Sequence, residues 1–94
     1  MVHLCYRRGD EFPVRPYYTI RLIGGRENLT EIKEWLSLQK YATNIDCSET
    51  YHYIAFKDCA RSVLLSHGEF LVMTDTGHFR TYTEGNFFKE FFIS

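Results

Sequence analysis

Arginine and tyrosine side chains recur together in this chain and could form a binding face. The residues of this candidate face are Arg7, Arg8, Tyr17, Arg21, Arg80 and Tyr82. Guanidinium groups bind phosphates and carboxylates through two hydrogen bonds at once, and tyrosine rings stack on bases or anchor protein interfaces. The alternative is a solvent-exposed strand face, on which arginine and tyrosine pack across strands and favour solubility. The binding face is therefore a hypothesis.

Cysteine and histidine side chains give no comparable signal for catalysis or metal binding. The three cysteines are Cys5, Cys47 and Cys59, and no Cys-x-x-Cys or His-x-x-x-His spacing of metal sites occurs. Cys47 with His52, or Cys59 with His67, would supply a thiol and an imidazole, but neither pair has the flanking sequence of a thiol enzyme. We interpret the thiols as buried or half-buried, and His67 and His78 as solvated turn residues. The sequence therefore predicts no enzyme activity, cofactor or metal site, and a small thiol-dependent enzyme is the least favoured alternative.

Charge is nearly balanced over the chain but uneven along it. Of 94 residues, 11 are Lys or Arg and 12 are Asp or Glu, for a net charge of −1. Residues 1–26 hold five arginines against Asp10 and Glu11, a net +3, and residues 27–94 hold six basic and ten acidic side chains, a net −4. General nucleic-acid binding needs a strongly basic face, so this balance argues against it. A local contact with a phosphate or an acidic protein stays open.

The chain carries no recognisable signal for export or membrane insertion. Its beginning, MVHLCYRR, lacks the apolar stretch of a signal peptide, and no apolar run approaches membrane-spanning length. The odd number of cysteines differs from the even, dense pattern of secreted disulfide scaffolds. We therefore expect a cytoplasmic protein that makes no membrane contact.

The first half of the chain predicts a strand followed by a helix. The strand has two faces, with Tyr18, Ile20 and Leu22 on the expected core side and Tyr17, Thr19, Arg21 and Ile23 on the other. Asn28 is expected to cap a helix that reaches Lys40, and Glu31 to complete a capping box. The helix should bury one apolar stripe, which consists of Leu29, Ile32, Trp35 and Leu36.

The second half predicts short strands and a last helix. The expected strands are Thr43–Ser48, Tyr51–Phe56, Ser62–Leu65, Phe70–Thr74 and Phe79–Thr83. The last three should form an antiparallel meander, because a glycine occurs in each short connection between them. Tyr51–Phe56 is apolar on both faces, which favours a central position in a sheet. Thr83 is expected to cap a helix that carries Phe87, Phe88, Phe91 and Phe92.

These elements predict one α+β domain over residues 1–94. It should have a mostly antiparallel sheet of four to six strands, a packed central helix and a short C-terminal helix. If the strands of Arg21 and Arg80 are neighbours, their guanidinium groups could converge on one anionic partner. Phe88 and Phe92 belong to an aromatic edge that either packs on the sheet or serves as an oligomer or partner surface.

Two stretches of the chain resemble small accessory proteins of tailed bacteriophages. One is YYTIRLIGGRENLTEIKEWL, a strand, a glycine turn and a helix, and the other is HGEFLVMTDTGHFRTYTEGNFFKEF, which ends in the phenylalanine-rich segment. Together they span about half the chain, and the likeness is one of order and pattern. The chain departs from it at His67-Gly68-Glu69, where such proteins often have Pro-Gly-Asp.

The resemblance implies a phage-encoded inhibitor that blocks a bacterial defence component by protein–protein contact in the host cytoplasm. The alternative is a sponge that holds a small nucleotide signal between arginine and tyrosine side chains. A homodimer also stays open. A sponge should have a deep pocket lined by Arg21, Arg80 and tyrosines. A protein inhibitor should instead present a flat or convex aromatic and charged patch.

Overall fold

The computed structural model describes residues 1–9, 15–40, 42–59, 61–75 and 78–93. Within these residues the chain forms two helices and eight strands, arranged in two antiparallel sheets. The predicted α+β class, with a packed central helix and a short C-terminal helix, is confirmed. The single predicted sheet is wrong, because the strands divide between two sheets. No helix in the described part of the chain is long and apolar enough to cross a membrane.

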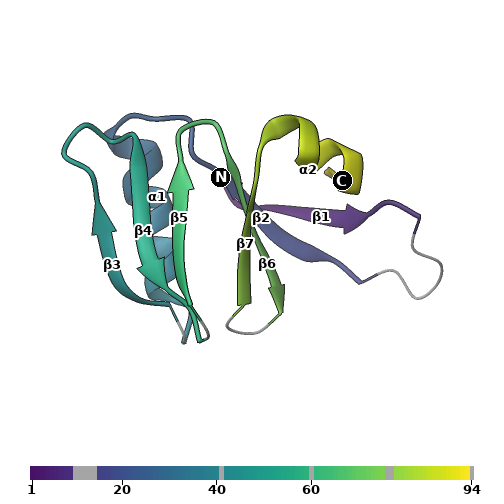
Figure 1. Cartoon of the computed structure of the whole chain (residues 1–94), viewed down its shortest axis with the longest axis horizontal. Coiled ribbons are helices and arrows are strands. Elements are labelled where there is room, and N and C mark those ends of the chain that lie inside the picture. Colours follow the sequence, from purple (N-terminus) through teal and green to yellow (C-terminus); the bar gives the residue numbers. More distant parts are fainter. Residues whose placement is uncertain (10–14, 41, 60, 76–77, 94) are drawn as a thin grey trace.

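The larger sheet contains both ends of the described chain. Its five strands, in the order β7-β6-β2-β1-β8, are β1 (His3–Arg7), β2 (Tyr17–Arg21), β6 (Phe70–Asp75), β7 (His78–Tyr82) and β8 (Phe91–Ile93). Each strand pairs antiparallel with its neighbours. Figure 1 shows this sheet on the right, beside the smaller sheet.

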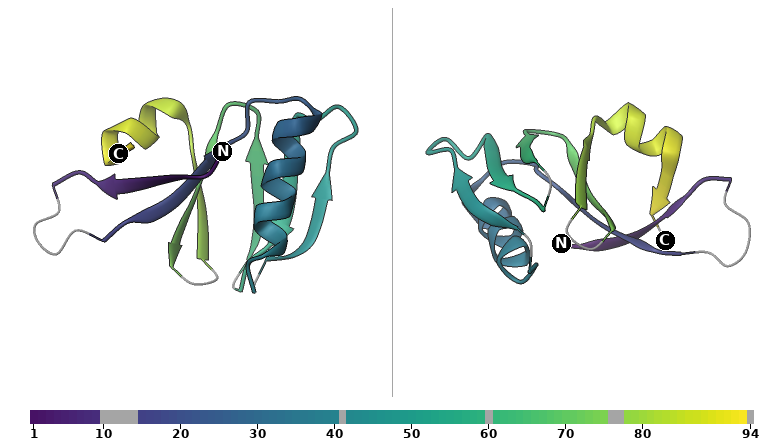
Figure 2. Two further views of the ribbon diagram at one scale, coloured as in Figure 1. Left: turned by 180° about the vertical axis from the view of Figure 1, so that it is seen from behind. Right: turned by 60° about the horizontal axis from the view of Figure 1, so that its bottom comes forward.

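The smaller sheet and its helix form an insertion between β2 and β6. The sheet has three strands in sequence order, β3 (Thr43–Cys47), β4 (Tyr53–Lys57) and β5 (Ser62–Ser66), and α1 (Arg26–Ser37) lies across one of its faces (Figure 2). The insertion starts and ends at adjacent points. Gly68 N donates to Leu22 O at 2.6 Å, and Leu22 N donates to Glu69 O at 3.1 Å.

The predicted meander of the last three strands forms only in part. β6 pairs with β7 as expected, but β5 pairs with β4 and has no ladder with β6. Gly68, with φ of +88°, lies where the chain crosses from one sheet to the other. Val63 and Leu65 are buried in a core that both sheets share, so the strand's alternating pattern fits either sheet. β4 is central in its sheet, as predicted.

Helix α1 begins three residues earlier than predicted and without a side-chain cap. Gly25, with φ of +86°, occupies the N-cap position. Asn28 instead links the helix to the end of β2: its Nδ2 donates to Arg21 O at 3.0 Å, and its Oδ1 accepts from Ile23 N at 2.9 Å. The predicted capping box is therefore wrong. The helix also ends at Ser37, before Lys40.

The main hydrophobic core lies between α1, the smaller sheet and one end of the larger sheet. The predicted helix stripe is confirmed, because Leu29, Ile32 and Leu36 are buried and Trp35 packs edge-on against Phe79 at 6.0 Å between ring centres. Leu22, directly after β2, joins them, and the buried residues that join from the strands are Ile20, Ile54, Phe56, Val63, Leu65, Leu71 and Phe79.

A second core lies on the opposite face of the larger sheet, under α2 (Glu84–Glu90). Phe87 is fully buried there and stacks on Phe70, with ring centres 4.1 Å apart. Thr83 caps α2 as predicted, since its Oγ1 accepts from Asn86 N at 3.4 Å. The helix stops at Glu90, however, and the following Phe91–Ile93 segment pairs with β1 as β8. The prediction of one helix carrying all four phenylalanines is therefore wrong.

Asp58 and Arg61 fasten the edges of the two sheets to each other. The carboxylate of Asp58, only 8% exposed, accepts from Arg61 N at 2.8 Å and from Phe79 N on β7 at 3.3 Å. The Arg61 guanidinium donates to Phe79 O at 3.3 Å. The side chains of Asp58 and Arg61 thus bond the main-chain nitrogen and the main-chain oxygen of Phe79. Phe79 lies on β7, the edge strand of the larger sheet that runs alongside β5.

Candidate functional site

Arg7 and Arg8, two of the predicted binding residues, hold the C-terminal segment onto the sheet. Arg7 donates to Glu90 Oε1 at 2.5 Å, and its guanidinium lies 5.1 Å from the centre of the Phe91 ring. Arg8 Nε donates to the main-chain oxygens of Phe88, at 2.7 Å, and Phe91, at 3.1 Å. These contacts stabilise the fold. They also use part of the hydrogen-bonding capacity of both guanidinium groups before any partner binds.

Arg21 and Arg80 do not converge as the sequence suggested. Arg21 is on β2 and Arg80 on β7, with β6 between them. Arg21 Nε donates to Gly68 O at 3.0 Å, its terminal nitrogen pairs with Glu84 at 3.2 Å, and its guanidinium lies 4.9 Å from the Phe70 ring centre. The expected outward face of β2 is also covered by α2, which leaves Thr19 only 1% exposed.

Arg21→Glu is expected to lower the free energy of unfolding by about 1 kcal/mol. The substitution removes the ion pair between Arg21 and Glu84, and the new carboxylate repels that of Glu84. Combining it with Glu84→Arg should restore part of that loss. Arg80→Glu is the matched control, since Arg80 is exposed and interacts with the Tyr82 hydroxyl in place of a carboxylate, and its unfolding free energy should change less. Urea unfolding curves measure all three. Equal destabilisation by Arg21→Glu and Arg80→Glu would show that the Glu84 contact contributes nothing.

The predicted tyrosines are partly buried and pack against the second core. The Tyr17 ring meets Phe91 edge-on at 5.8 Å, and the Tyr82 ring meets the same phenylalanine edge-on at 5.4 Å. Burial, with a smaller contribution from the charge of Glu90, raises the pKa of the Tyr82 hydroxyl. Neither ring forms the accessible stacking platform that the sequence suggested.

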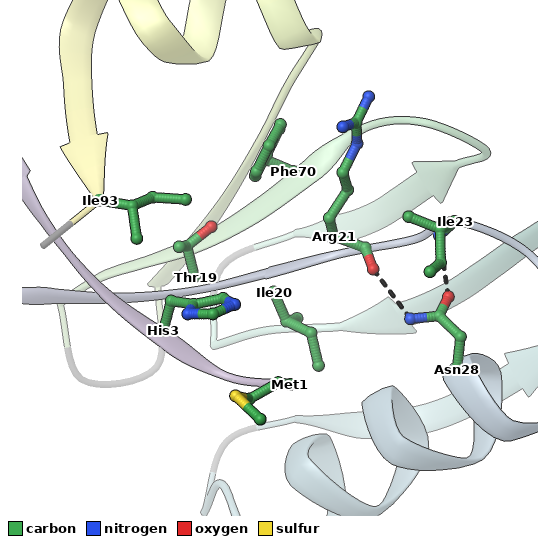
Figure 3. Close-up of a pocket in the computed structure, with 9 residues that line it drawn as sticks. All are labelled: Met1, His3, Thr19, Ile20, Arg21, Ile23, Asn28, Phe70 and Ile93. Atoms are coloured by element: carbon green, nitrogen blue, oxygen red, sulfur yellow. Dashed lines mark hydrogen bonds between the residues drawn. The ribbon is translucent and has the colours of Figure 1, made fainter.

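A small cavity adjoins Arg21, at the junction of β1, β2 and the start of α1 (Figure 3). Its volume is about 210 Å³, whereas pockets for small-molecule ligands commonly measure about 300–1,000 Å³. Apart from Arg21, none of the predicted binding residues lines it. Figure 3 shows the Arg21 guanidinium pointing away from His3 and Met1, which lie across the cavity. The cavity does not match the deep arginine- and tyrosine-lined pocket expected of a nucleotide sponge.

The larger sheet leaves part of one face uncovered. β1 and β2 extend beyond the smaller sheet, and in Figures 1 and 2 α2 covers only their opposite side. Directly paired residues share a face, and the pairs here are Leu4 with Tyr18, Tyr18 with Met73, and Tyr6 with Phe92. We call these five residues, Leu4, Tyr6, Tyr18, Met73 and Phe92, the distal apolar face, and Met73 at its border also packs against the main core.

The distal apolar face exposes several large side chains at once. Leu4 is 38% exposed, Tyr18 46% and Phe92 42%. Tyr6 stacks on Phe92 with ring centres 5.6 Å apart, and the exposed Arg8 lies 5.7 Å above the Phe92 ring. The prediction that Tyr18 faces the core with Ile20 and Leu22 is wrong for Tyr18, because α1 and the smaller sheet stop short of it.

Phe88 and Phe92, the predicted aromatic edge, lie on different sides of the larger sheet. Phe88 is on α2, 39% exposed, and meets Phe70 edge-on at 5.5 Å. Phe92 is on β8 and belongs to the distal apolar face. Tyr6 and Tyr18 stand close to the arginines in the sequence, but nothing in their spacing predicts that they share an apolar face with Leu4 and Phe92, because an alternating pattern alone does not show where the covering layer ends.

The three thiols differ sharply in environment. Cys5 is fully buried, and this burial raises its pKa to about 11, although Arg7 opposes the shift. Burial also raises the pKa of the half-buried Cys47. Cys59 is exposed, which corrects the prediction of buried or half-buried thiols.

The histidines also make contacts that the sequence did not suggest. His78 Nε2 lies 3.3 Å from Cys59 Sγ, and His67 Nε2 lies 3.0 Å from Ile23 O. His67 and His78 are exposed as predicted, but each also contacts a distant part of the chain, which was not predicted. Within the described ranges, no group of three or more His, Cys, Asp or Glu side chains could hold a metal ion.

Comparison with protein-family models, with curated proteins and with solved structures finds no match to this chain.

Proposed function

We propose that this chain is a non-enzymatic binding protein that contacts another protein through the distal apolar face. The observation that carries the proposal is the joint exposure of Leu4, Tyr18 and Phe92 on one side of the sheet. Neighbouring apolar side chains gathered on one surface mark interaction sites more often than scattered ones do. Tyrosine and phenylalanine are also enriched at protein interfaces, where they anchor the contact.

Charge favours a partner with an acidic rim. β1 and β2, which form much of the distal apolar face, belong to residues 1–26, whose net charge of +3 is partly balanced where Arg7 pairs with Glu90 and Arg21 with Glu84. The exposed Arg8 beside Phe92 brings one of these charges to the edge of the face. A second copy of the chain would add a second Arg8 to the contact, whereas a surface rimmed by Asp and Glu would complement this charge.

A phosphorylated small ligand is less well supported. Arg7, Arg8 and Arg21 already interact with carboxylates or main-chain oxygens of the same chain. The hollow along α1 carries three carboxylates, those of Glu27, Glu31 and Glu34, against the single guanidinium of Arg26, so its net charge disfavours a phosphate.

The resemblance to phage accessory proteins makes a bacterial defence protein the first partner class to test. In that role the chain inhibits by covering a surface of its target in the host cytoplasm, and no bond is made or broken.

Two double variants test the proposal. Leu4→Ser with Tyr18→Ser removes two members of the distal apolar face. Tyr53→Ser with Leu64→Ser removes a leucine and a tyrosine of similar exposure, 42% and 55% for Tyr53 and Leu64, from the smaller sheet. We expect a partner recovered from bacterial lysate to be lost only with the first variant. With the purified partner, that variant should raise the Kd at least tenfold.

Three outcomes would overturn the proposal. They are unchanged Kd for the Leu4→Ser and Tyr18→Ser variant, equal loss with both variants, and a nucleotide found bound to the native protein by mass spectrometry. Light scattering tests whether the distal apolar face binds a second copy of the chain. A dimer that only the Leu4→Ser and Tyr18→Ser variant disrupts would identify a second copy as the occupant of the face in place of an acidic partner.

A further inference from the structure

Cys59 and His78 lie together on the surface although 19 residues separate them in the chain. Cys59 follows β4, His78 opens β7, and Sγ lies 3.3 Å from the imidazole Nε2. Both residues are exposed. A thiol beside an imidazole can transfer its proton to the ring nitrogen, and the resulting thiolate is the reactive form of cysteine.

One buried and one partly buried hydrogen bond hold this pair in place. Asp58 directly precedes Cys59, and its carboxylate accepts from the main-chain nitrogen of Phe79, the residue that follows His78. Arg61 donates to the main-chain oxygen of the same phenylalanine. The main chain next to each member of the pair is therefore fixed relative to the other. This juxtaposition depends on the folded contact between the two sheets.

We propose that Cys59, assisted by His78, is a thiol-modification site that reacts with low-molecular-weight disulfides. The site uses no residue of the distal apolar face and is independent of the proposed binding function. Cys5 and Cys47 are the internal controls for this reaction. Cys5 is fully buried and Cys47 half-buried, so the reagent reaches the first not at all and the second only in part.

The reaction is a thiol–disulfide exchange. His78 Nε2 accepts the proton of Cys59 Sγ, and the thiolate attacks one sulfur of the small disulfide. A bond forms between Sγ and that sulfur while the bond between the two reagent sulfurs breaks. The second reagent sulfur leaves with the electron pair and takes the proton from His78. Cys59 is oxidised to a mixed disulfide, and the leaving half of the reagent is reduced to a thiol.

The test compares cysteine reactivity in folded and urea-unfolded protein. Oxidised glutathione is the probe, and peptide mass spectrometry gives the rate at each cysteine at one neutral pH. Unfolding separates Cys59 from His78 and exposes Cys5. We therefore expect unfolding to slow modification of Cys59 about tenfold, because the imidazole that accepts its proton is no longer beside it, and to accelerate that of Cys5. Opposite changes at two cysteines of one sample cannot come from a general effect of urea.

His78→Gln should slow Cys59 modification in the folded protein about tenfold, whereas His52→Gln, which removes another exposed histidine, should leave it unchanged. Continued protection of Cys5 shows that each variant is folded. Folded wild-type protein in which Cys59 reacts no faster than Cys47 would refute the proposal. So would equal rates for wild type and a folded His78→Gln variant.

Discussion

Leu36→Ala is expected to lower the free energy of unfolding by about 2–5 kcal/mol. Leu36 is fully buried in the main core, at the end of the α1 stripe. Alanine would leave a cavity between the helix and the smaller sheet, whose side chains can close it only in part. Small domains commonly have total stabilities of about 5–15 kcal/mol, so the loss should be visible at once in urea unfolding followed by circular dichroism.

Leu38→Ala is the matched control, at the C-cap position directly after α1. Leu38 lies two residues further along and is 82% exposed. Its replacement should change the unfolding free energy by no more than about 0.5 kcal/mol. Similar losses for Leu36→Ala and Leu38→Ala would mean that α1 presents a different face to the core.

Phe87→Ala is expected to cost about 3–5 kcal/mol, through the second core. Phe87 is fully buried, and its ring stacks on Phe70 at 4.1 Å and on Phe91 at 5.4 Å. Without it α2 loses its main contact with the larger sheet. Hydrogen exchange should then show faster exchange in α2 and β8 than in α1, while urea unfolding gives the total loss.

Phe88→Ala distinguishes packing from helix propensity at the next position of α2. Phe88 is 39% exposed, so we expect a loss of about 1 kcal/mol. A larger loss for Phe88→Ala than for Phe87→Ala would contradict the orientation of α2 on the sheet.

Local pattern was sufficient to predict the elements whose partners are close in sequence. The spacing of Leu29, Ile32 and Leu36 predicted the buried stripe of α1, and Thr83 predicted the start of α2. Asn28 was misassigned because its side chain can cap a helix or bind nearby main-chain groups equally well. Only the tertiary position of β2 decides that it binds Arg21 O and Ile23 N.

The candidate site could not be derived in the same way. Residue type marked Arg7 as a binder of carboxylates, but its carboxylate proved to be Glu90 of the same chain, 83 residues away. The exposure of Tyr18 depends on where a different sheet ends, and the meeting of Cys59 with His78 depends on how two sheets join. Such long-range relations leave no periodic trace in a single sequence.

The placement of residues 23–67 as an insertion has a consequence for the order of folding. Their helix and three strands follow one another along the chain, and each of these strands pairs with its neighbour in sequence. Short-range contacts of this kind form quickly, whereas pairing of distant strands is slow. β1, by contrast, pairs with β8 across nearly the whole chain. During synthesis on a ribosome, the insertion can therefore assemble while the hairpin of β1 and β2 still waits for β6 and β8 to emerge.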